Sequence, residues 1–125
     1  MAFQYGTAYL VLADSGNEAL VRFYAALLGA EPDVQISGVY AEFQLTAMRL
    51  GIFQPKAAHQ AAFEAPSSGR MSLCFEVVDL NDAIAHMSEL GYAPPHDILT
   101  SSHGREVHAF DPMGNRIIFY QKNPV

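Results

Sequence analysis

A carboxylate and an imidazole two residues apart, Glu106 and His108, are the first candidates for chemistry in this sequence, and His103 lies nearby. Residues two apart on a strand share a face, so this pair has the donor types that bind a metal ion or move a proton. Two donors on one strand make a poor metal site without a third and a fourth, which favours a structural or surface role. His108 reaches a ligand, or acts as an acid or base, only if its strand turns that face inward. The sequence leaves that orientation open.

Two similar stretches supply the next candidates and the elements that position them. Residues 49–54 read RLGIFQ and residues 116–121 read RIIFYQ. Each stretch closes a longer unit, which opens with an apolar strand ending in Asp14 or Asp79 and continues with a helix ending in Gly. One supersecondary unit used twice predicts pseudo-two-fold symmetry, with concave faces that meet at a shared cleft.

Hydrophobic periodicity predicts a strand, a helix and three more strands in each copy, which is an α+β fold. In the first copy we expect strands over 3–13, 34–36, 39–45 and 48–53 and a helix over 18–28. In the second we expect strands over 71–78, 93–99, 106–110 and 116–121 and a helix from Asp79 or Asn81 to Gly91. The linker, 54–69, is rich in Pro, Ser and Ala, and its pattern does not decide whether it contains a helical turn.

Composition narrows the class of protein. The 125 residues carry a formal net charge of -6 with only 7 Lys plus Arg, which argues against nucleic acid or a membrane surface as a partner. No apolar run is long enough for a membrane helix or a signal peptide, so we expect a cytoplasmic protein. The single cysteine, Cys74, lies in an apolar run, which favours a buried, inert thiol. We assign no role to the remaining histidines, His59, His86 and His96.

Three segments carry a family resemblance: residues 21–29 (VRFYAALLG), 75–79 (FEVVD) and 111–119 (DPMGNRIIF). With them the chain resembles the vicinal oxygen chelate superfamily, which includes glyoxalase I, bleomycin-resistance proteins and extradiol dioxygenases. The resemblance implies one domain over 1–125, with module one at about 3–54, a linker at about 55–69 and module two at about 70–122. It also implies an open, cup-like eight-stranded pseudo-barrel of two βαβββ modules with the helices outside. Homodimers are usual in such families, and the cup forms either within one chain or across a dimer.

Many of these proteins hold a divalent metal through His, Glu, His and Glu, from the first and last strand of each module. The resemblance maps those positions onto Thr7, Gly51, Ser72 and Ile118. Gly and Ile have no side-chain donor, and hydroxyls are weak ligands. A shift of one residue in either direction does not restore a set of four ligands. We therefore expect no metal site and no cofactor.

Strand alternation predicts which side chains line the cup. Residues two away from the former ligand positions share their face, and the opposite face is almost wholly aliphatic or Phe. The predicted ligand-binding residues are Tyr9, Arg49, Phe53, Glu76, Arg116 and Tyr120. The two arginines either hold a carboxylate or phosphate or sit exposed at the rim, paired with Glu42 or Glu76. The aromatic residues either stack on a planar ligand or fill the cup.

We expect a metal-free protein that binds a small molecule and sequesters or senses it. The alternative is a lyase, isomerase or dioxygenase-type enzyme of the same superfamily with a relocated or absent metal, in which Glu76, His108 or a Tyr acts as acid or base. Glu76 suits that role if it is buried, and otherwise is an exposed strand carboxylate. Glyoxalase I activity is disfavoured, because its enediolate needs a metal as Lewis acid. A third reading is an interaction module.

Overall fold

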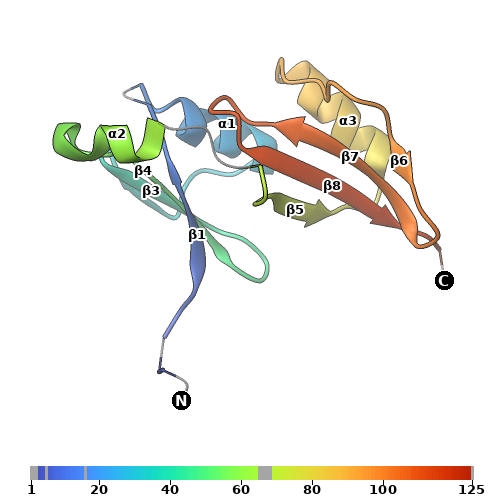
Figure 1. The fold of residues 1–125 in the computed structure, drawn as a ribbon, viewed down its shortest axis with the longest axis horizontal. Helices are drawn as coiled ribbons and strands as arrows, with labels where there is room; N and C mark the ends of the chain where they lie inside the picture. The colour runs from blue at the N-terminus through green and yellow to red at the C-terminus, as the bar shows by residue number, and fades with distance from the viewer. Residues whose placement is uncertain (1–2, 5, 16, 65–68, 125) are drawn as a thin grey trace. The chain divides into compact units, whose positions relative to one another are not determined.

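The protein consists of two compact units, Met1–Ala65 and Pro66–Val125, each built around a four-stranded mixed sheet (Figure 1). The structure is a computed structural model that describes residues 3–4, 6–15, 17–64 and 69–124. The α+β class and the two βαβββ-like modules are confirmed. None of the helices in these described stretches is long and apolar enough to cross a membrane.

The first unit follows the predicted element order. Its elements are β1 (Tyr9–Ala13), α1 (Ala19–Leu28), β2 (Val34–Ile36), β3 (Tyr40–Gln44), β4 (Arg49–Phe53), the 3₁₀ turn η1 (Ala57–His59) and α2 (Gln60–Glu64). The sheet order is β1-β4-β3-β2, with β1 parallel to β4 and the other pairs antiparallel. The first strand begins at Tyr9 and not at residue 3. The linker does contain helical structure, namely η1 and α2.

The second unit repeats this topology. Its elements are β5 (Leu73–Glu76), α3 (Leu80–Glu89), β6 (Leu99–Thr100), β7 (Gly104–Phe110) and β8 (Arg116–Lys122), in the sheet order β5-β8-β7-β6. The predicted strand over 93–99 is wrong, because only Leu99 of that range is in β6. Pro94 and Pro95 lack the N–H groups that a strand ladder uses, so regular pairing starts after them.

One face of each sheet is apolar and buried, as the alternation predicted. In the first unit the buried set is Ala41, Phe43, Leu50 and Ile52. In the second it is Leu73, Val107, Ala109, Ile117 and Phe119. Helix α3 packs across β7 and β8 (Figure 1). Its Leu80 and Met87 are fully buried. The opposite face of each sheet, called the polar face below, carries the candidate site residues.

The carboxylate of each repeated Asp, which follows the first strand of its unit, accepts from a backbone N–H in the first turn of the next helix. Both carboxylate oxygens of buried Asp14 accept from Leu20 N at 3.1 Å, and Oδ1 also accepts from Ser15 N at 2.7 Å. Asp79 caps α3 by accepting from Asp82 N at 3.2 Å, which decides between the two predicted caps.

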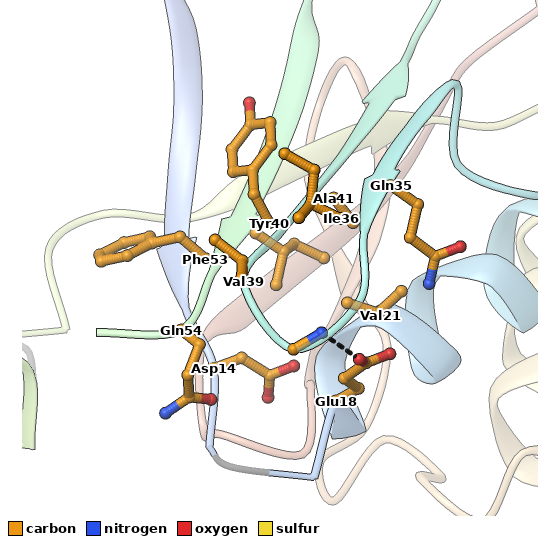
Figure 2. Close-up of a pocket in the computed structure, with 12 residues that line it drawn as sticks. Asp14, Glu18, Val21, Gln35, Ile36, Val39, Tyr40, Ala41, Phe53 and Gln54 are labelled. Atoms are coloured by element: carbon orange, nitrogen blue, oxygen red, sulfur yellow. Dashed lines mark hydrogen bonds between the residues drawn. The ribbon is translucent and has the colours of Figure 1, made fainter. Parts of the chain in front are cut away.

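A small cavity lies beside Asp14 in the first unit (Figure 2). Its volume is about 10 Å³, close to that of a single water, and its lining includes Asp14, Glu18, Val21, Ala41 and Ile52. The Glu18 carboxylate closes one side by accepting from Gly38 N at 2.5 Å. The cavity is therefore too small for an organic ligand and belongs to the junction between α1 and its sheet.

We expect Asp14→Ala to destabilise the protein by about 1–2 kcal/mol, because it removes a helix cap and leaves buried N–H groups without an acceptor. Asp14→Asn keeps one acceptor oxygen and should lose less. Urea unfolding measures the difference, with exposed Asp97→Ala as the control that stays near wild type. Equal urea midpoints for Asp14→Ala and wild type would contradict the capping role.

Candidate functional site

The polar face of the second sheet gathers most of the titratable candidates. The strand register forms two rows across β5, β8 and β7, which are Glu76–Tyr120–Glu106 and Cys74–Ile118–His108. This register decides the orientation that the sequence left open. His108 lies on the same face as Ile118, one of the positions that the family pattern assigns to a metal ligand.

Glu106 and His108 form a direct hydrogen bond on this face. His108 Nε2 donates to Glu106 Oε2 at 2.7 Å. The side chain of His108 is 30% exposed and that of Glu106 is 32% exposed. His108 Nδ1 has no hydrogen-bond partner within the described part of the chain. His103 does not join the pair. Its ring lies against Tyr120, with centroids 5.8 Å apart, and contacts Ser101 Oγ.

Cys74 is exposed, so the expectation of a buried thiol is wrong. Its strand places it on the polar face, while its neighbours Leu73 and Phe75 alternate to the other side. Loss of hydration raises the pKa of the Cys74 thiol, and the negative charges of Glu106 and Glu76 raise it further. The thiol is accessible but is held in its less reactive protonated form.

The remaining candidates of the second unit have partners of their own. Glu76 is exposed, which matches the surface reading and not the buried base. Tyr120 Oη donates to the His103 carbonyl at 3.1 Å. Arg116 Nη1 donates to the Gly69 carbonyl and lies 3.3 Å from Ser72 Oγ, so part of this guanidinium is engaged by its own chain.

The polar face of the first sheet holds a tyrosine, a carboxylate and an arginine in contact. Tyr40 Oη donates to Glu42 Oε1 at 2.9 Å, and Arg49 Nη1 lies 4.0 Å from Glu42 Oε2. The structure therefore contains the predicted alternative in which Arg49 pairs with Glu42. The 4.0 Å separation is at the upper limit for an ion pair. Sequence reasoning missed Tyr40 as a site residue. The antiparallel register that pairs Tyr40 with Phe53 and Glu42 with Gly51 is what reveals it.

Tyr40 covers the glycine that stands at a family ligand position. A Cβ placed on Gly51 would lie 2.8 Å from Tyr40 Oη and 3.2 Å from Tyr40 Cε1. Real Cβ atoms essentially never approach that closely, so the tyrosine occupies the space of any side chain at this position. Of the other candidates here, Phe53 meets Phe63 of α2 edge-on at 5.1 Å, and Tyr9 is 47% exposed beside Arg49.

The residues at the four family positions do not suit the family's metal ion. Thr7 and Ser72 are exposed hydroxyl residues just outside β1 and β5. Gly51 lies beneath Tyr40, and Ile118 is aliphatic. Among the described residues, no group of three or more His, Cys, Asp or Glu side chains is arranged to hold a metal. Hard or borderline divalent ions need such nitrogen and oxygen donors.

The contact with Glu42 changes the pKa of the Tyr40 hydroxyl. Burial, the hydrogen bond to Glu42 and the charge of Glu42 raise the pKa of Tyr40 from 10.0 to about 12. The folded state holds this proton more tightly than the unfolded chain, so the stability it contributes is complete below pH 10 and is lost as the pH rises towards 12.

Wild type should lose stability between pH 10 and 12 as the Tyr40 hydroxyl ionises. Tyr40→Phe has no such hydroxyl, so we expect its urea midpoint to fall less over the same pH range. Glu42→Gln should lower the pKa of Tyr40 but leave it above 10.0, because the effect of burial remains. The ultraviolet absorbance of tyrosinate measures this pKa. Tyr92→Phe, at an exposed tyrosine, is the control. Parallel loss of stability in wild type and Tyr40→Phe would refute the assignment.

Comparison with known proteins agrees with the two-unit architecture. The chain resembles a solved protein of Agrobacterium tumefaciens at 25% identity and a TM-score of 0.75, covering 97% of this chain and 100% of that one. A glyoxalase/bleomycin resistance protein from Catenulispora acidiphila matches at 25% identity and a TM-score of 0.67, covering 94% and 98%. Lactoylglutathione lyase from A. tumefaciens, at 18% identity, a TM-score of 0.65 and coverage of 94% and 95%, shares the fold.

No curated protein sequence matches the chain closely enough to count as a relative. The family model named Glyoxalase/Bleomycin resistance protein/Dioxygenase superfamily matches residues 6–119. That match covers β1 to β7 and the first four residues of β8. The chain therefore belongs to the glyoxalase/bleomycin resistance protein/dioxygenase superfamily.

Proposed function

We propose that the protein binds a small organic molecule on the polar faces of its sheets and does so without the family's divalent metal. These faces combine aromatic and aliphatic surface with a few charged groups, the usual profile of a ligand pocket. The proposed contact residues are Tyr9, Arg49, Phe53, Glu76, Arg116 and Tyr120. The role would be to sequester or sense the ligand, as bleomycin-resistance proteins do.

The main support is Tyr40 lying over Gly51. In the family pattern this strand offers a carboxylate to the metal, whereas here a tyrosine ring fills the space above a glycine. The corresponding position of the second unit is Ile118, which also lacks a donor atom. Stabilising an enediolate in the glyoxalase manner depends on a Lewis-acidic metal. Residues that cannot hold the ion favour binding over that chemistry.

The two arginines differ in how available they are to a ligand. Arg49 donates through Nε to Gln44 Oε1 at 3.3 Å, and its 4.0 Å separation from Glu42 leaves that ion pair weak. Arg116 is bonded to the Gly69 carbonyl. Arg49 is therefore the better placed of the two to contact an anionic or polar group of the ligand.

Metal analysis combined with ligand screening tests this function. We expect protein purified from cells supplied with Fe, Mn, Ni and Zn to contain far less than one metal ion per chain by mass spectrometry. After dialysis against EDTA, a panel of phenols, aromatic acids and aromatic amines should include compounds that raise Tm, and adding metals back should not change the result. Arg49→Gln should weaken the response of polar compounds, with Glu89→Gln on the exposed side of α3 as the control.

A tightly bound, stoichiometric metal that is lost on mutation of a polar-face residue would overturn the metal-free part of this proposal. Ligand responses that appear only after metal is added would do the same. A complete lack of response across the panel would count against ligand binding itself.

The space above Gly51 can be tested separately by a double-mutant cycle. Gly→Ala is normally neutral or slightly stabilising where the backbone permits Ala, but here the added methyl meets Tyr40. We expect Gly51→Ala to cost about 1–3 kcal/mol in wild type and much less in a Tyr40→Ala background, measured by urea unfolding. If Gly51→Ala has the same small effect in both backgrounds, Tyr40 does not occupy the position.

A further inference from the structure

We propose that the first unit has a second binding site, a groove between helix α1 and the edge strand β2, and that its occupant is an extended segment of a partner protein. The segment alternates basic and β-branched residues and adds a strand to the free edge of the sheet, which is a common way for proteins to bind peptides. The groove lies on the helix side of the sheet, so this inference is independent of the ligand proposed for the polar faces.

The groove has room for such a segment. It is an open cavity of about 510 Å³ whose lining belongs to the first unit alone. Val21, Ala25 and Ala26 line it from α1, and Pro32 and Gln35 line it from the chain that leads into and forms β2. The side chains from α1 are short, which leaves the space between helix and strand unfilled. Figure 2 shows the Gln35 side chain extending from β2 towards α1.

The outer edge of β2 carries a backbone donor and acceptor that its own sheet does not use. In β3 the backbone of Glu42 faces β2, because its carbonyl accepts from Asp33 N at 2.8 Å. Val34, which pairs with Glu42, therefore turns its backbone groups inward to β3. Successive residues alternate, so the N–H and C=O of Gln35 point outward. No hydrogen bond from a described residue occupies either group.

These two groups set how a partner strand pairs. Antiparallel pairing is the more stable arrangement per residue, and residues directly opposite each other in it share a face. The partner residue opposite Gln35 exchanges two backbone hydrogen bonds with it and points its own side chain into the groove. The partner residues before and after that one point to the other face of the sheet.

The other face of this edge favours β-branched partner residues. Val34 and Ile36 lie there, paired with Glu42 and Tyr40, and they are 44% and 55% exposed. Cross-strand β-branched side chains pack well against such a pair. Covering the two aliphatic side chains removes apolar surface from water, which adds affinity to the two backbone hydrogen bonds.

The charges of the groove favour a basic residue at the position that enters it. Glu18 and Glu31 line the groove against one guanidinium, that of Arg22, which donates to the Asn17 carbonyl. Asp33 adds a third carboxylate at the start of the same edge. A partner lysine lays its methylene chain along the alanines of α1 and brings its ammonium to the carboxylates at the rim.

The same charges argue against a second copy of this chain as the occupant. Its edge would bring a further Glu31 and Asp33 to an edge that already carries them, and each chain has a formal net charge of -6. Charged side chains at an exposed edge are a usual means by which proteins prevent self-pairing. The groove therefore fits a basic, extended segment of another protein.

The first test uses the fluorescently labelled peptide VKVKVKV and the full-length protein. Fluorescence polarisation should show binding that weakens as salt is added, because salt screens the attraction between the charges. The acidic peptide VEVEVEV should bind about tenfold more weakly, since it replaces several attractive charge pairs with repulsive ones. Amide chemical shifts should change in α1 and in residues 30–36, and not in β5, β7 and β8.

Two N-methylated peptides of identical charge test the backbone pairing. Methyl groups on the lysine nitrogens lie on the edge that faces β2 and remove the donor to the Gln35 carbonyl. Binding should then weaken about fivefold, the size expected for one backbone hydrogen bond. Methyl groups on the valine nitrogens lie on the far edge and should leave the affinity close to that of the unmodified peptide.

Matching changes can be made in the protein. An edge strand accepts proline where the N–H faces outward, so Gln35→Pro keeps the ladder to β3 and removes the outward donor. We expect it to weaken binding of VKVKVKV about fivefold, whereas Gln35→Ala keeps the N–H and should stay near wild type. Glu31→Gln should weaken binding about twofold, with Glu89→Gln on α3 as its control. If Gln35→Pro lowers the urea midpoint, the two methylated peptides decide the question on wild type.

Several results would overturn the inference. They are equal affinity for the two methylated peptides, equal affinity for VKVKVKV and VEVEVEV, no binding of VKVKVKV, and amide shifts outside α1 and residues 30–36. A dimer seen by light scattering that Gln35→Pro converts to a monomer would also overturn it, because a second copy would then occupy the edge. The ligand site of the polar faces is tested separately, with small molecules.

Discussion

Burial of one face of each sheet is the constraint on which the rest of this structure depends. Strands alternate their side chains between two faces, so a one-residue slip would exchange the apolar face for the polar one. Leu50 and Ile52 in β4, and Ile117 and Phe119 in β8, are almost fully buried. Their burial fixes the register of both sheets and, with it, the outward direction of every candidate site residue.

The same register explains why a tyrosine ring fills the space at the family's metal position in the first sheet. In the first sheet, Tyr40 lies diagonally across from Gly51 and fills the space that a side chain there would use. In the second, Tyr120 lies over Gly104, where an added Cβ would also come within 2.5 Å of the Gln121 carbonyl. An aromatic ring covering a cross-strand glycine is a packing solution that restores buried surface to a strand. In the first sheet this packing replaces a donor atom with a ring.

Much of the fold was predictable because it depends on patterns among residues close together in the sequence. The period of apolar residues gave both long helices and most strands, and the Asp and Gly residues gave their ends. The errors arose where local pattern and backbone chemistry disagree. The apolar stretch before Leu99 contains two prolines that cannot join a ladder, and Cys74 lies in an apolar run whose alternate members face outward. Tyr40 was missed because its role depends on a strand that pairs with its own.

By itself, the sequence determined the repeated unit, the apolar face of each sheet, the family resemblance and the lack of metal donors at the family positions. These follow from residue type and spacing, which need no knowledge of distant contacts. Only the tertiary structure decided that Tyr40 covers Gly51, that His108 shares a face with Ile118, and that His108 donates to Glu106. Those facts depend on which strands pair and in which register, and many residues far apart in the chain set that register together.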